Sequence, residues 1–153
     1  MTHSLARRIT FVAALVAAGL AVAAPPAGGD LGALHSGIGK PVDVGDVKVP
    51  KATGPEARTV AEIVANKASL KDKGVVVRGK VVKFTPDVLG KNWLHIRDGS
   101  GSAADNTNDV LVTTKAQAKV GDVVLAKGTV RTDLDLGSGY SYKVLVDDAT
   151  LTR

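Results

Sequence analysis

The sequence predicts an all-β fold with a small helical content, in the form of a small five-stranded antiparallel barrel or sandwich. From Gly74 onward, apolar residues alternate with polar ones, which is the period of strands with one buried face. Between these segments lie stretches rich in glycine, asparagine and aspartate, which are typical of turns. Many short strands so close together are typical of small closed or two-layered sheets. The predicted strands are Val75–Phe84, Trp93–Arg97, Val110–Thr114, Val123–Arg131 and Tyr140–Val146.

Two of the predicted strands carry the same apolar pattern around a central glycine. The first reads Val75-x-Val77-x-Gly79-x-Val81, and the fourth reads Val124-x-Ala126-x-Gly128-x-Val130. We expect the apolar residues of both strands to form the inward face. A glycine in mid-strand weakens a flat sheet, but it lets a strand coil sharply around a narrow barrel. The shared pattern therefore favours a closed barrel over a flat sandwich.

One short helix is predicted before the strands, over about Val60–Asn66. Thr59 and Glu62 have the spacing of a capping box, in which each side chain accepts from a backbone N–H at the helix start. Ile63 and Val64 extend an apolar stripe along one face. Since so short a helix is unstable alone in water, we expect it to pack on the strands.

The first 23 residues are typical of a bacterial secretory signal peptide. Arg7 and Arg8 give a positive start, an uncharged run of small and apolar residues follows, and the run ends in an Ala-x-Ala site before Pro25. This run is shorter than the ~20 residues that span a bilayer, so no stable membrane anchor is expected after cleavage. Residues 24–54 hold seven glycines and four prolines and are predicted to form a disordered linker. The folded domain is expected over residues 55–153, in a periplasmic or secreted protein.

The composition argues against several kinds of chemistry. The chain has no cysteine, which excludes disulfides, thiolate metal sites, c-type haem and a cysteine nucleophile. The serines lie in glycine-rich turns without a paired base, and no Walker or dinucleotide-binding glycine motif occurs. We therefore expect a non-enzymatic protein with no catalytic residue, no bound metal and no cofactor.

Several motifs of the chain occur together in an order that is typical of one superfamily. They are Thr59-Val60-Ala61-Glu62, Val75–Val82, Asn92–Gly101, Lys119–Val124, Lys127–Val130 and Gly137–Tyr140. In these motifs, residues 56–150 resemble the OB-fold superfamily of oligonucleotide- and oligosaccharide-binding barrels. More narrowly, they resemble small exported bacterial OB-fold proteins described as DNA- or nucleotide-binding. The resemblance implies a five-stranded antiparallel OB barrel with the short helix packed on it, and it implies nucleic-acid binding.

The chain departs from the superfamily in one segment. Many OB barrels carry a helix between their third and fourth strands, but Lys115–Val120 is much shorter than such a helix. We expect the helix at Val60–Asn66 to cover that end of the barrel instead.

The same alternation predicts a ligand-binding face. If Leu94 and Ile96 point inward, then Trp93, His95 and Arg97 point outward from the second strand. In OB barrels the second and third strands, with the first–second and fourth–fifth loops, form the usual ligand face. Trp93 would stack on a base while cationic side chains follow the phosphates. The predicted ligand-binding residues are Trp93, His95, Arg97, Arg78, Lys80, Lys91, Lys127, Arg131 and Tyr140.

Other interpretations of these residues compete with a binding face. Charged side chains ordinarily point outward from a half-exposed sheet, and a single tryptophan more often packs against a loop than awaits a ligand. Tyr140 and Tyr142 share a face and would most simply fill space near the barrel end. The net charge of +5 is small for a polyanion binder. An oxygen-rich loop carries the kind of ligands that calcium takes, but that loop lacks a bidentate glutamate at EF-hand spacing. Its oxygen-bearing residues are Asp98, Asp105, Asn106, Asn108 and Asp109.

Two functional hypotheses of different classes follow. The leading one is an exported OB-fold module that binds single-stranded nucleic acid or another polyanion. The alternative is an envelope protein–protein interaction module, which the expected location favours because free nucleic acid is scarce outside the cytoplasm. An oligosaccharide is a third candidate ligand, and it would use the same face without needing the arginines.

Overall fold

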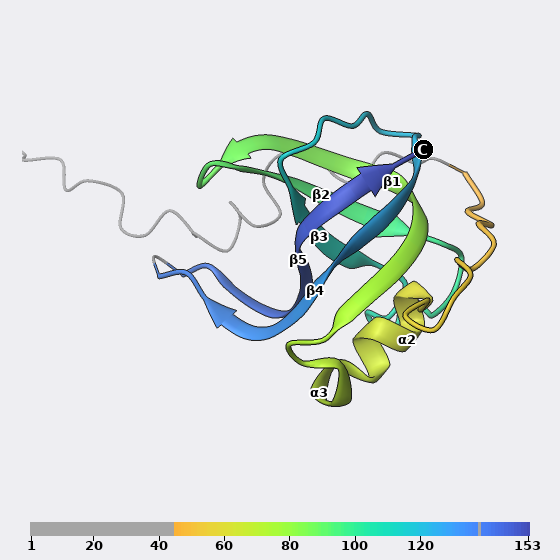
Figure 1. The fold of residues 1–153 in the computed structure, drawn as a ribbon, viewed down its shortest axis with the longest axis horizontal. Helices are drawn as coiled ribbons and strands as arrows, with labels where there is room; N and C mark the ends of the chain where they lie inside the picture. The colour runs from red at the N-terminus through yellow and green to blue at the C-terminus, as the bar shows by residue number, and fades with distance from the viewer. Residues whose placement is uncertain (1–44, 138) are drawn as a thin grey trace, which may run out of the picture.

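The computed structural model describes residues 45–137 and 139–153, which are coloured in Figure 1. The predicted signal peptide and most of the predicted linker lie outside the described residues. The described chain is mostly β, with two short helices that precede five strands. The helices are α2 at Val60–Ala65 and α3 at Lys67–Leu70. The strands are β1 at Gly74–Val88, β2 at Lys91–Arg97, β3 at Val110–Thr114, β4 at Val123–Asp135 and β5 at Ser141–Thr152.

The five strands close into a ring in the order β1-β2-β3-β5-β4, with β4 paired to β1. Neighbours are antiparallel except β3 and β5, which run parallel through Leu111 opposite Leu145 and Val112 opposite Val146. The prediction of a wholly antiparallel sheet is therefore wrong at this pair, and the sheet is mixed. The reason is one of parity. A ring with an odd number of strands cannot alternate in direction all the way round, so one pair must be parallel.

The two glycine-centred patterns lie side by side, on β1 and β4. In the antiparallel register, Gly79 is opposite Val124 and Gly128 is opposite Val75. A Cβ at Gly79 would lie 3.0 Å from the carbonyl oxygen of Arg97, and one at Gly128 would lie 2.7 Å from that of Asp147. Each glycine thus admits the backbone of a neighbouring segment at close range, as a narrow ring requires.

The main core fills the inside of the ring, as predicted from the alternation. The valines and alanine of both patterns are buried there. Helix α2 covers one end of the ring, at the bottom of Figure 1, and its Val60 and Ile63 are fully buried in the same core. The prediction that this helix packs on the strands is confirmed. The first turn of the helix is bound by two side chains that follow β2. The N–H of Val60 donates to Asp98 Oδ2 at 2.9 Å, and the N–H of Ala61 donates to Ser100 Oγ at 3.0 Å.

Four strands are longer than the alternation predicted, and one of them, β2, begins two residues earlier, at Lys91. β1 continues to Val88, β4 to Asp135 and β5 to Thr152. The added ends of β1 and β4 belong to two hairpins, β1–β2 and β4–β5, whose tips project to the left of Figure 1. The added end of β5 pairs instead with the start of β4, at Leu125–Lys127. Turn-forming residues such as Pro86 had indicated earlier strand ends. Cross-strand pairing with β2 and with β5 carries the backbone through them.

Residues before the predicted domain start also contact the ring. The N–H of Val49 donates to the carbonyl oxygen of Asp98 at 2.9 Å, and Ala52 is buried. Residues 45–54, which the sequence assigned to the linker at 24–54, are thus among the described residues, and two of them pack against the domain. None of the helices in the described residues is long and apolar enough to cross a membrane.

Candidate functional site

A second apolar cluster lies on the opposite side of β2 and β3 from the main core. Trp93 alternates with Leu94 and Ile96, which are fully buried in the main core, and Trp93 instead packs with Leu111 and Leu145. The predicted alternation along β2 is therefore confirmed. Side chains from the two projecting hairpins complete this cluster, namely Val88, Leu134 and Tyr142.

The indole of Trp93 is held tightly in this cluster. Only 7% of the residue is exposed, and its Nε1–H donates to the carbonyl oxygen of Val88 at 2.9 Å. Its ring centroid lies 5.1 Å from that of Tyr142, with the two planes tilted by 37°. The exposed stacking surface expected from the sequence is therefore absent at Trp93. The competing interpretation, in which a lone tryptophan packs against a loop, describes its surroundings better.

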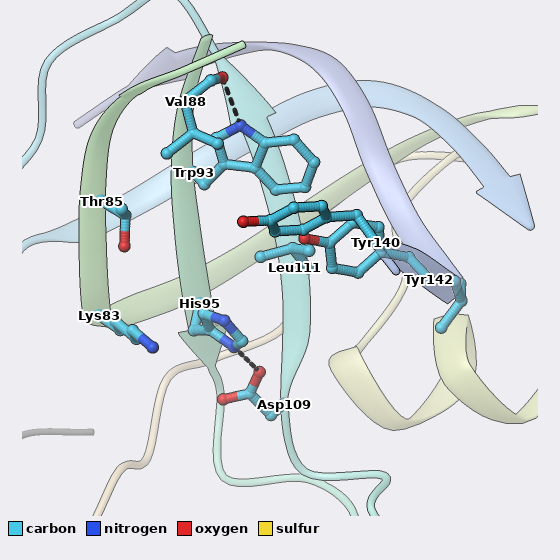
Figure 2. Close-up of a pocket in the computed structure, with 10 residues that line it drawn as sticks. Lys83, Thr85, Val88, Trp93, His95, Asp109, Leu111, Tyr140 and Tyr142 are labelled. Atoms are coloured by element: carbon cyan, nitrogen blue, oxygen red, sulfur yellow. Dashed lines mark hydrogen bonds and ion pairs between the residues drawn. The ribbon is translucent and has the colours of Figure 1, made fainter. Parts of the chain in front are cut away.

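Beside Trp93 the surface is hollowed into a pocket of about 390 Å³ (Figure 2). Its lining comes from β1, β2, β3 and β5 and from the residues next to them. The apolar and aromatic lining residues are Val88, Trp93, Leu111, Tyr140, Tyr142 and Val144. The remaining lining residues are Lys83, Thr85, His95 and Asp109. The pocket brings together three of the predicted ligand-binding residues, which are Trp93, His95 and Tyr140.

Asp109 organises the polar end of the pocket. Its Oδ1 lies 2.6 Å from Nδ1 of His95, and its Oδ2 accepts from Nε of Arg97 at 3.2 Å. One carboxylate thus holds two of the predicted binding residues. Arg97 is turned to this ion pair and is not among the residues that line the pocket.

Burial also changes the chemistry of the tyrosine beside Trp93. Burial raises the pKa of the Tyr142 hydroxyl, and the nearby Tyr140 adds to the rise. The hydroxyl of Tyr142 therefore stays protonated at any physiological pH and can donate a hydrogen bond.

Lys91 lies at the tip of the β1–β2 hairpin, where it pairs with Val88, and its side chain is engaged in an ion-pair cluster. Its Nζ lies 2.8 Å from a carboxylate oxygen of both Asp147 and Asp148. Asp147 also accepts from the hydroxyl of Thr113 at 2.5 Å. Burial tends to raise the pKa of Asp147, but the hydrogen bonds from Lys91 and Thr113 outweigh it and lower that pKa. This cluster ties β2, β3 and β5 together outside the pocket.

The other predicted cations lie on β1 and β4 and are not brought to the pocket. Lys127 pairs with Glu56 at 3.2 Å, and Arg131 pairs with Asp72 at 2.6 Å. Arg78 lines a separate hollow of about 400 Å³ near residues 48–50. Lys80 is opposite Arg97 in the β1–β2 register. The structure thus divides the predicted set between an aromatic pocket and a scattered group of surface charges.

The oxygen-rich loop is not assembled as a metal site in the part of the chain that the structure describes. Asp98 accepts from the start of helix α2 and from Ser100, while Asp109 faces His95 and Arg97. The described residues contain no group of three or more His, Cys, Asp or Glu side chains that could hold a metal ion.

Two pocket residues, Lys83 and Thr85, were not predicted from the sequence because β1 contains a bulge. The β1–β2 register shifts between Val81 and Lys83, so the inward alternation of β1 is reversed beyond that point. Lys83 and Thr85 therefore turn to the pocket, although strict alternation from Val81 would have pointed both inward. No residue type marks this bulge in the sequence. Tyr142 did carry a signal, since it shares a face with Tyr140 two residues earlier.

Comparisons with known proteins assign no family to the chain, so the site is interpreted from its geometry. A scan against protein-family models gives no match, and a search of curated proteins finds no significant match.

Proposed function

We propose that the protein is an exported, non-enzymatic OB-type module whose pocket receives a base of single-stranded nucleic acid. The observation that carries this proposal is the concave pocket with three aromatic side chains between the two projecting hairpins. Its lining residues on β2 and β3 lie on the face that OB barrels use for ligands, and both neighbouring loops flank it.

The strand order supports the OB assignment. β1, β2 and β3 are successive antiparallel neighbours, and β4 returns to lie beside β1. This spatial order, with the fourth strand beside the first, is that of a Greek key. A five-stranded Greek-key barrel is the general description of the OB fold.

The pocket's size and lining suit one planar ring rather than a long strand of stacked bases. Its volume of about 390 Å³ is near the lower end of the ~300–1,000 Å³ that is usual for ligand pockets. Aromatic walls bind the face or edge of a base without regard to its sequence. Lys83 lines the pocket and forms no ion pair within residues 45–137 and 139–153, so it is available for a phosphate.

An oligosaccharide is a second candidate ligand, and the pairing of the cations favours it. Lys91, Arg97, Lys127 and Arg131 each lie within ion-pair distance of a carboxylate. A polyanion would have to compete with those carboxylates, whereas a neutral sugar would not. Aromatic walls with a few polar groups also suit a sugar ring.

The fluorescence of Trp93 provides the test, because it is the only tryptophan of the chain and lies in the pocket wall. The protein is titrated with a single-stranded oligodeoxynucleotide and with a neutral oligosaccharide, at low and at high salt. Nucleic-acid binding predicts a fluorescence change with DNA that weakens at high salt and in Lys83→Ala. The matched control is Lys127→Ala, on β4 and outside the pocket, which should bind like the wild type. A response to the sugar alone, insensitive to salt, would replace nucleic acid by oligosaccharide.

A further inference from the structure

The hydrogen bonds of Asp109 determine what His95 offers to a ligand. A carboxylate only accepts hydrogen bonds, and Asp109 lies 2.6 Å from Nδ1 of His95. In the neutral imidazole, the proton must therefore sit on Nδ1. His95 lines the pocket, and no hydrogen bond to its Nε2 is formed within the described residues. Nε2 is then a bare acceptor at the pocket wall, beside the Asp109 contact in Figure 2.

We infer that His95, oriented by Asp109, selects bases that carry an exocyclic amino group, by accepting a hydrogen bond from that group at Nε2. This inference rests on the proposed function, and it adds which bases the pocket prefers. The other polar side chains of the lining are donors or can act as donors. Lys83 only donates, and the hydroxyls of Thr85, Tyr140 and Tyr142 can donate. Two side-chain groups of this lining can only accept hydrogen bonds, namely the Asp109 carboxylate and Nε2 of His95. The Asp109 carboxylate is already engaged by two partners, so Nε2 is the acceptor that remains for a ligand.

Arg97 makes this arrangement sensitive to a single substitution. Oδ1 of Asp109 faces His95, and Oδ2 accepts from Nε of Arg97. In Asp109→Asn, the one remaining oxygen goes to Arg97, because guanidinium nitrogens only donate. The introduced amide NH₂ then faces Nδ1 of His95 and donates to it. The imidazole proton moves to Nε2, which turns from an acceptor into a donor.

The test compares two oligonucleotides that differ only in the amino group. One carries adenine, and the other carries purine, which has the same rings without the 6-amino group. Binding is followed by Trp93 fluorescence at pH 8, where histidine is ordinarily neutral. For the wild type we expect the adenine oligonucleotide to bind about fivefold tighter, which is the size of one neutral hydrogen bond. In Asp109→Asn this preference should disappear or reverse.

The matched control is Asp105→Asn, the same chemical change in the same loop at an exposed position, and it should keep the preference. The tautomer itself is read by ¹⁵N NMR of the free protein, using the signal that is missing in His95→Gln. A merely structural role for Asp109 would not move the proton from Nδ1 to Nε2.

The outcomes separate this inference from the function on which it rests. If both oligonucleotides bind equally well to the wild type, or if the His95 proton sits on Nε2, the inference is overturned while the pocket remains a base-binding site. If neither oligonucleotide binds, the proposed function fails, and the base preference fails with it.

Discussion

Trp93 and Tyr142 pack against each other on the outside of the ring, with ring centroids 5.1 Å apart. One residue comes from β2 and the other from the β4–β5 hairpin, so this contact fastens a projecting hairpin to the body of the sheet. The same two side chains also form part of the pocket wall. Stability of the hairpin and shape of the pocket are therefore coupled.

Tyr142→Ala should loosen this hairpin and expose Trp93. Removal of the aromatic ring should lower the free energy of unfolding by about 1–3 kcal/mol, since it deletes packing and an aromatic pair. The emission of Trp93 should shift to longer wavelength because water reaches the indole. Urea unfolding followed by fluorescence measures both effects. Tyr142→Phe keeps the ring and should keep the emission maximum of the wild type; a shift as large as that of the alanine variant would contradict the ring's role.

Gly128→Ala should destabilise the ring. The new Cβ would lie 2.7 Å from the carbonyl oxygen of Asp147 and 2.9 Å from Cγ1 of Val146, and β5 must move to admit it. We expect a loss of about 1–3 kcal/mol, the usual range for overpacking. Gly74→Ala is the control, because its Cβ would meet only the flexible carboxylate of Glu56, at 3.2 Å. Equal midpoints of urea unfolding for the two variants would argue against the close approach at Gly128.

Asp98→Ala should weaken the attachment of helix α2. Asp98 is buried and accepts from the N–H of Val60 and from both the N–H and the hydroxyl of Ser100. Without the carboxylate these donors lose their partner, at a cost of about 1–3 kcal/mol. Hydrogen exchange at the Val60 amide should accelerate. Asp105→Ala, at an exposed position of the same loop, should leave both the stability and the exchange unchanged.

The Lys91 cluster predicts how stability changes in acid and in base. The pKa of Asp147 is lowered in the folded state, so its stabilisation is present above the unfolded pKa of about 3.9 and is lost as the pH falls through the folded value. Burial alone would lower the pKa of Lys91, but hydrogen bonds to Asp147 and Asp148 outweigh it and raise that pKa. The contribution of Lys91 is thus complete below about pH 10.4 and is lost as the pH rises through its folded value.

Thermal unfolding of the wild type and of Lys91→Met across these two pH ranges measures the effect. The difference between the two proteins should be largest near neutral pH and should shrink below about pH 4 and above about pH 10.4. A difference that is constant with pH would mean that Lys91 stabilises the protein through its methylene groups alone. Lys127→Met, whose pair with Glu56 is largely exposed, should differ little from the wild type at any pH.

The sequence predicted those features that depend on regular alternation. The inward valines around Gly79 and Gly128, the opposite orientation of Trp93 and Leu94, and the position of helix α2 all follow from local patterns. The parallel β3–β5 pair also has a simple cause, since closure of five strands requires it. The parallel pair can be inferred only if the sheet is known to be closed, however, and the alternation of apolar residues does not by itself predict closure.

The pocket could not be predicted in the same way, because it depends on long-range register. The bulge after Val81 redirects Lys83 and Thr85, and no sequence signal marks it. The β4–β5 hairpin that covers Trp93 comes from residues far along the chain, so a local sequence pattern does not predict the burial of Trp93. Ion pairs such as that of Arg131 with Asp72 likewise join segments that are distant in the sequence. They engage cationic side chains that the sequence analysis had assigned to the ligand-binding face.

The position of β5 has a consequence for the order in which the molecule can be completed. β5 pairs with β3 on one side and with β4 on the other, and it follows every other strand along the chain. A newly made chain that stops short of residue 141 leaves two open edges, each ready to pair with another molecule. Loss of the last strand should therefore yield an incomplete, aggregation-prone sheet rather than a smaller stable domain. Synthesis must reach β5 before the edges of β3 and β4 are paired and the protein is protected from aggregation.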